Sequence, residues 1–239
     1  MAIIAALFIA ALVQGATGFG FGLVGLGILG VLLAEFADAS VVLAVPCLAL
    51  TGSMLWRLRR RVKVDRMTPL IVMSILAMPV GVLALKHARP EGLYVALSLL
   101  LAGAVVQQAV PRLAGRRWHP LWLGVPCGIF SGLLSGAFNT GGPPVVAYVT
   151  SQRFDRFRHV GVLALVFCLF NVARIINLSA FGLLTWRLVL LGLAAVPAIL
   201  LGMLIGMRLL TRMSDRILRI IVSVALFLLS VRYLYLAFA

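Results

Sequence analysis

Long apolar stretches, separated by short polar segments, follow one another along the whole chain. A helix needs about 20 mostly apolar residues to cross the hydrocarbon core of a bilayer. Division at the charged residues gives apolar segments at 1–34, 40–56, 68–85, 93–110, 119–150, 160–178, 188–207 and 217–238. Most have the length of one spanning helix, but 1–34 and 119–150 are too long for one and have glycine-rich centres. We predict that each of these two forms a pair of short helices joined by a break.

Composition agrees with an all-α, polytopic integral membrane protein. Hydrophobic residues make up 63% of the 239-residue chain and charged residues 11%, against about 45–50% and about 25% in soluble domains. The net charge of +15 would suggest a nucleic-acid partner in a soluble protein. In a membrane protein it is first attributed to the excess of Lys and Arg on the cytoplasmic side, so we expect the lipid bilayer and no nucleic acid as a partner.

The distribution of basic residues predicts the orientation in the membrane. Four basic loops, at 57–66, 111–118, 151–158 and 208–219, are assigned to the cytoplasm by the positive-inside rule. The segment 119–150 must then enter and return to the same face, and the C-terminus lies outside. The segment 1–34 starts and ends outside if it is also a hairpin. A single tilted pass with an inside N-terminus is the alternative.

The two halves of the chain show a weak internal repeat. Residues 14–22 align with 135–143, and the same offset places Cys47 over Cys168. The basic loop 57–66 then corresponds to the uncharged 179–186. We therefore predict two inverted repeats, 1–118 and 119–239, each with a broken first helix pair plus three spanning helices. Inverted repeats are a feature of secondary transporters, whose substrate sites lie near the midplane at broken helices.

The predicted breaks have the chemistry of an anion site. Glycines allow the backbone to approach a ligand closely, and the N-terminus of a half-helix presents free N–H groups and a positive dipole end. The candidate substrate-binding glycines are Gly18, Gly20, Gly22, Gly141 and Gly142. Neutral hydrogen bonds are expected from Gln14, Thr17, Ser135, Asn139 and Thr140. The alternative is that the glycines only permit close helix packing.

Two further polar residues of segment 160–178, Asn171 and Arg174, are added to the candidate site because they can share a helix face. Arg174 could instead extend to the membrane interface. The segments contain no mid-span Asp or Glu, so a carboxylate proton relay is not supported, and export or facilitated flow of an anion is favoured. We find no catalytic, metal-binding or ATP-binding motif and predict neither an enzyme nor a cofactor.

The glycine-rich motifs resemble those of the TauE/SafE sulfite exporter family of membrane permeases. The resemblance rests on two motifs, Gly15-Ala-Thr-Gly18-Phe-Gly20-Phe-Gly22 and Ser131-Gly132-Leu-Leu-Ser135-Gly136-Ala-Phe-Asn139-Thr-Gly141-Gly142-Pro143-Pro144. The first departs from the family pattern at Phe21 and lacks a following proline. The resemblance implies a duplicated protein of the bacterial inner membrane that exports sulfite or organosulfonates, with both glycine-rich tips as binding positions. A channel-like facilitator of other small anions is the alternative. Substrate, coupling ion and oligomeric state, monomer or homodimer, stay open.

Overall fold

Every regular element that the computed structural model describes is a helix, which confirms the predicted all-α class. The described residues are 2–33, 36–59, 67–109, 120–152, 154–212 and 215–238. The predicted repeat boundary at 118/119 and much of the basic loops fall outside them. The helices are α1 (Ala2–Thr17), α2 (Phe21–Leu32), α3 (Phe36–Val42), α4 (Ala44–Leu58), α5 (Thr68–His87), α6 (Pro90–Ala109), α7 (Pro120–Phe138), α8 (Gly142–Ser151), α9 (Arg156–Ala180), α10 (Trp186–Arg212) and α11 (Asp215–Phe238).

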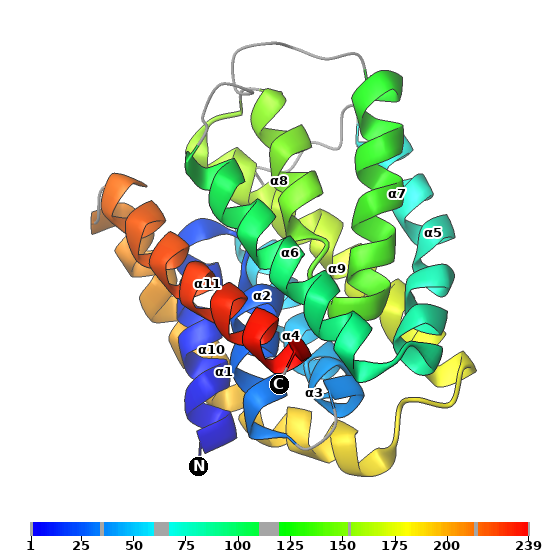
Figure 1. Cartoon of the computed structure of the whole chain (residues 1–239). Coiled ribbons are helices and arrows are strands. Elements are labelled where there is room, and N and C mark those ends of the chain that lie inside the picture. Colours follow the sequence, from blue (N-terminus) through cyan, green and yellow to red (C-terminus); the bar gives the residue numbers. More distant parts are fainter. Residues whose placement is uncertain are drawn as a thin grey trace.

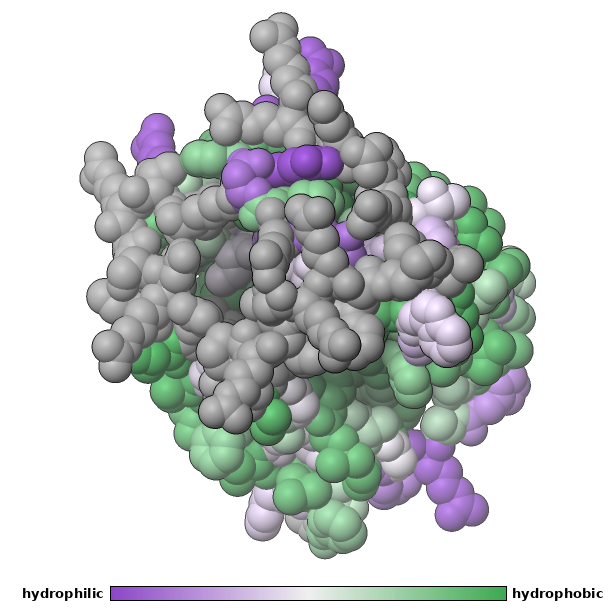
Figure 2. All heavy atoms as spheres, turned by 90° about the horizontal axis from the view of Figure 1, so that it is seen from above, coloured by the Kyte–Doolittle hydropathy of each residue, from purple (hydrophilic) through white to green (hydrophobic). Residues whose placement is uncertain are grey.

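The outer surface of the bundle is apolar, as lipid requires. Within the described residues, four segments are long and apolar enough to cross a membrane, at 36–58, 68–87, 157–180 and 186–209. The visible sides of the molecule in Figure 2 are mostly hydrophobic. Large exposed apolar side chains among the described residues include Leu76, Leu99, Phe130, Ile176 and Leu228.

Both predicted breaks are confirmed. The first lies between α1 and α2, at residues 18–20, and the second between α7 and α8, at residues 139–141. The return helices α2 and α8 have 12 and 10 residues, which is about 18 and about 15 Å, roughly half of the hydrocarbon core. In Figure 1, α1 rises from the N-terminus at the bottom, whereas α7 descends from the top.

The predicted segment 40–56 is confirmed as part of one apolar span over 36–58, but its helix begins earlier than predicted and contains an interruption. Helix α3 already begins at Phe36, with Asp38 in its first turn, where the helix dipole favours a carboxylate. The helix is then interrupted at Leu43, before α4. The cause is Pro46, because a proline ring excludes the carbonyl four residues earlier, here that of Val42, the last residue of α3.

Close helix contacts depend on small residues. Helix α7 packs on α5, and α1 packs on α10. Gly132 and Gly136 lie directly against the backbone of Ser74 and Met78, and Gly206 lies against the backbone of Leu12. The remaining extensive pairs are α4 with α9 and α6 with α11. We match the helices of the two halves in order, so that α1 corresponds to α7, α4 to α9, α5 to α10 and α6 to α11. An exchange of the halves then turns the α1–α10 pair into the α7–α5 pair and leaves the α4–α9 and α6–α11 pairs unchanged.

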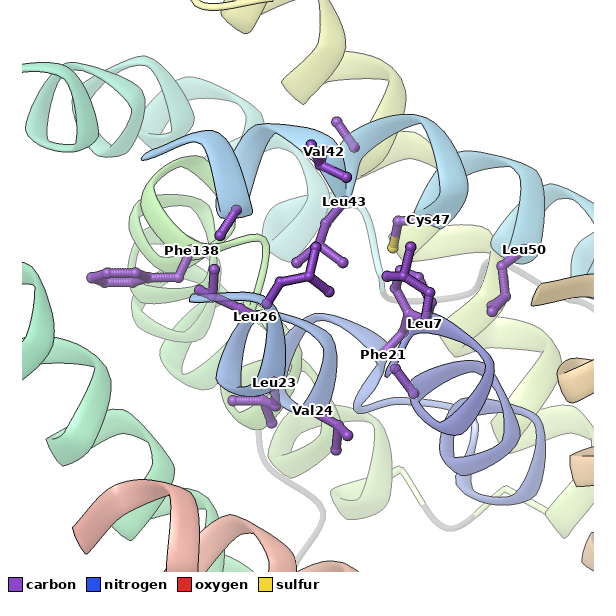
Figure 3. Packing of buried hydrophobic residues seen from close by; sticks show 14 of the residues in the cluster. Leu7, Phe21, Leu23, Val24, Leu26, Val42, Leu43, Cys47, Leu50 and Phe138 are labelled. Atoms are coloured by element: carbon purple, nitrogen blue, oxygen red, sulfur yellow. The ribbon is translucent and has the colours of Figure 1, made fainter. Parts of the chain in front are cut away.

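The first broken hairpin is buried in the main hydrophobic core. Side chains of α1 and α2 meet those of the junction between α3 and α4 and of the end of α7 there, including Leu7, Phe21, Leu43 and Phe138 (Figure 3). Leu7, Phe21 and Leu43 are fully buried. Phe21, directly after the first tip, therefore anchors this break in the hydrophobic core.

Candidate functional site

The first tip turns through two left-handed glycines. Gly18 has φ 85° and Gly20 has φ 104°, values that favour glycine. The hydroxyl Oγ1 of Thr17 lies 2.6 Å from the carbonyl oxygen of Phe19. Across the break, the side-chain oxygen Oε1 of Gln14 accepts a hydrogen bond of 3.0 Å from the N–H of Phe21. Gln14 therefore caps α2 from α1 and directs its amide nitrogen away from that bond.

The second tip turns at Asn139, the position that aligns with Gly18. Asn139 has φ 57°, and Asn is among the residues that tolerate this region. The hydroxyl of Ser131 donates a 2.7 Å hydrogen bond to the carbonyl of Gly141, so that a side chain of α7 again crosses the break. Helix α8 begins with Pro143 and Pro144 at its first positions, which lack N–H groups. This tip must therefore rely on side-chain donors more than the sequence suggested.

The two tips touch each other. A Cβ atom built on Gly22 would overlap the backbone carbonyl of Asn139, and one on Gly142 would lie 3.3 Å from the ring of Phe19. Residues more than 100 positions apart in the chain thus form one site. The close approach explains why glycine stands at position 22.

A small cavity of about 30 Å³ lies where the tips meet. A volume of this size can accept a small polar ligand such as a water molecule. The lining combines both tips with α4 and α9 and comprises Gln14, Gly20, Gly22, Leu23, Cys47, Ser135, Asn139, Thr140, Gly141, Gly142, Phe167, Phe170 and Asn171. Nine of the candidate residues thus come together there.

Three buried polar atoms of residues that line the cavity have no hydrogen-bond partner among the described residues: Gln14 Nε2, Asn139 Nδ2 and Thr140 Oγ1. Gln14 and Thr140 are each 3% exposed. A buried polar group without a partner costs about 1–3 kcal/mol of stability. All three groups can donate a hydrogen bond. The arrangement therefore suits a ligand that supplies several acceptors.

The wall formed by α4 and α9 is internally hydrogen-bonded. The amide nitrogen of Asn171 donates to Phe167 O at 2.8 Å, and its contacts with Thr51 Oγ1 and Cys47 Sγ are both 3.3 Å. Asn171 therefore joins the two helices and has its donor occupied. Beside it, Phe167 and Phe170 make one side of the cavity apolar, and together with Leu23 they were missed from the sequence. Their apolar side chains carried no signal that separated them from core residues.

Three candidate residues, Thr17, Gly18 and Arg174, do not line the cavity. Thr17 and Gly18 shape the first tip. Arg174 is 0% exposed, so the alternative that it extends to the membrane interface is wrong. Its guanidinium instead binds Gly136 and Ser40 behind the second tip. In the part of the chain that is described, no group of three or more His, Cys, Asp or Glu residues could bind a metal ion.

An apolar helix bundle with two interrupted helices around a donor-lined cavity defines the class of membrane transporters. More specifically, the chain belongs to the sulfite exporter TauE/SafE family, whose sequence model matches residues 3–233 of the 239. The family predicted from the two glycine-rich motifs is thereby confirmed. No curated protein and no solved structure matches significantly.

Proposed function

We propose that this protein is a secondary transporter that exports small sulfur oxyanions, sulfite or an organosulfonate, across the bacterial inner membrane. The observation that carries the proposal is the set of three unpartnered buried donors on a cavity formed by both tips. An oxyanion has several acceptor oxygens and can satisfy all three. The free N–H groups expected at the start of α2 add donors of the same kind.

The distribution of charges supports export as the direction of transport. The carboxylates whose side chains are described, Asp38, Glu91 and Asp155, lie in the first turn or at the N-cap of a helix, and none lines the cavity. A carboxylate proton relay therefore has no support. One elementary charge moved through 100 mV changes its free energy by about 2.3 kcal/mol. Because the cell interior is negative, an anion can leave downhill without a coupled ion.

The helix arrangement supports two inverted repeats, 1–118 and 119–239, as the basis of alternating access. The pairs α1–α10 and α7–α5 correspond under an exchange of the halves. The hairpins enter from opposite ends of the molecule (Figure 1), and the left-handed residues Gly18 and Asn139 occupy aligned positions. A site between two such copies can be exposed to either side by movement of one copy against the other.

Efflux of radiolabelled sulfite from proteoliposomes tests the proposal. We expect saturable efflux that an inside-negative potential accelerates and that sulfite on the opposite side stimulates. Single-channel currents in place of this exchange would favour the channel-like alternative. If neither sulfite nor short organosulfonates are transported, or stabilise the protein against thermal unfolding, the substrate class is wrong.

Two substitutions test the site itself. Gln14→Glu keeps the oxygen that caps Phe21 but replaces the unpartnered donor with a negative oxygen, so sulfite efflux should be lost in a folded protein. Asn139→Ala removes a second donor and should raise KM for sulfite. Asn177→Ala is the matched control, because the Asn177 amide binds its own helix at Ala173 O and lies outside the cavity lining. Normal sulfite transport by both site variants would remove the tips from the binding site.

A further inference from the structure

Arg174 connects three helices behind the second tip. From α9, its Nε donates to Gly136 O at 3.3 Å, its Nη1 to Ser40 O at 3.1 Å and its Nη2 to Ser40 Oγ at 2.6 Å. The Ser40 hydroxyl then donates to Ala137 O at 2.9 Å. The guanidinium and Ser40 together thus bind the carbonyls of consecutive residues near the end of α7. The hydrogen bonds join α3, α7 and α9 at one point.

Among the described residues, no carboxylate binds the buried positive charge of Arg174. The side chain is fully buried, and an arginine stays protonated in proteins. The oxygens that accept its hydrogen bonds, on Gly136 and Ser40, are all uncharged. A buried charge is expensive unless opposite charge lies nearby. The last carbonyls of α7 supply part of it, because the C-terminus of a helix carries a partial negative charge. A bound anion can supply the rest of the negative charge that compensates Arg174.

The position of this charge relates it to the cavity. Gly136 and Ala137 immediately precede the tip that carries Asn139 and Thr140, two of the unpartnered donors. Asn171, one turn earlier on α9 than Arg174, lines the cavity. Without a cation, the negative end of α7 would face a bound anion and repel it. Arg174 occupies these carbonyls and opposes that repulsion.

At the aligned position, the first half does not have an arginine. The position of α4 that aligns with Arg174 is Ser53, whose hydroxyl donates to Ala49 O of its own helix at 2.7 Å. The charge therefore lies behind the second tip and not behind the first. Any difference between the two tips in anion binding must come partly from this asymmetry.

We infer that Arg174 is a positioning residue of the anion site: with Ser40 it fixes the end of α7, and its charge balances a bound oxyanion that it does not touch. The inference rests on the proposed function, because it assigns a role to Arg174 in that same site. It distinguishes Arg174 from the tip residues, which contact the ligand directly.

The experiment compares Arg174→Lys, Ser40→Ala, the double variant and Ser53→Ala as the matched control. Arg174→Lys keeps the charge but not the planar fork, and Ser40→Ala keeps the arginine but removes one acceptor. Each should raise KM for sulfite about tenfold, as expected for loss of a hydrogen bond to a charged group, with Vmax retained. The double variant should be no worse than Arg174→Lys, and Ser53→Ala should match the wild type.

Hydrogen–deuterium exchange of the ligand-free variants provides a readout that does not need transport. Arg174→Lys and Ser40→Ala should increase exchange over residues 136–142 while the other helices stay protected. An unchanged KM, or unchanged exchange over 136–142, would overturn the inference. A raised KM in Arg174→Lys with a normal KM in Ser40→Ala would also overturn it, because Arg174 would then contact the anion directly. If the wild type moves no sulfite, the proposed function fails, and the exchange data alone decide the role of Arg174.

Discussion

At the residue scale, the polar groups of the proposed binding site lower the stability of the ligand-free protein, and Thr140 shows this most simply. Its hydroxyl is buried without a partner among the described residues, which lowers stability by about 1–3 kcal/mol in the absence of a ligand. Valine has nearly the same shape but no hydroxyl. Thr140→Val should therefore raise the melting temperature of the ligand-free protein in detergent and raise KM for sulfite.

Ser74→Ala is the control for Thr140→Val. The Ser74 hydroxyl is equally buried but donates to Gly128 O at 2.8 Å, so its removal should lower the melting temperature. If Thr140→Val is as destabilised as this control, the Thr140 hydroxyl has a structural partner and is not reserved for the substrate.

Sequence reasoning found the polar part of the cavity because amides and hydroxyls are conspicuous in apolar segments. Gln14, Asn139 and Thr140 were recognised in this way. Phe167 and Phe170 were not, since a cavity wall and a core position require the same residue type. The place of Arg174 was also beyond prediction: its burial depends on Ser40 and Gly136, which only the tertiary fold brings to it.

At the scale of elements, the two interrupted helices matter because their tips meet. The contact between Gly22 and Asn139 leaves no space for a side chain. Gly22→Ala should separate the tips, lower the melting temperature and abolish saturable sulfite efflux. Gly52→Ala is a matched control in α4, because a Cβ there meets nothing within 4 Å, and alanine should stabilise this helix by up to about 1 kcal/mol. Wild-type efflux by Gly22→Ala would show that contact between the tips is not required.

The breaks could be predicted because two independent signals coincide there. Each segment is too long for one span, and each has glycines near its centre. The interruption at Leu43 was missed although Pro46 marks it, because a segment of suitable length and hydropathy was taken as a continuous helix. Its freed carbonyl at Val42 faces Gly192 of α10, a contact between distant segments that no local pattern reveals.

At the scale of the whole molecule, the proposed direction of transport depends on the orientation of the protein in the membrane. Helix α4 ends in a basic region in which Arg59 lies 5.4 Å from the ring of Trp56, and Trp56 is 65% exposed. Exposed tryptophans are typical of membrane interfaces, and basic loops of the cytoplasmic side. The turn between α9 and α10, by contrast, carries no charge over residues 181–185. We therefore predict that the end of α4 lies in the cytoplasm, and that the turn after α9 and the C-terminus lie outside.

Cysteine labelling checks this orientation. In a background without Cys47, Cys127 and Cys168, we expect an impermeant maleimide to label Thr185→Cys in intact cells. Arg59→Cys should react only after permeabilisation, because the inner membrane then no longer shields it. Arg59 and Thr185 are both exposed in the folded protein, so a difference in labelling reports the side of the membrane and not burial. The reverse pattern would invert the molecule in the membrane, and the link between the positive-inside charge distribution and the direction of export would have to be abandoned.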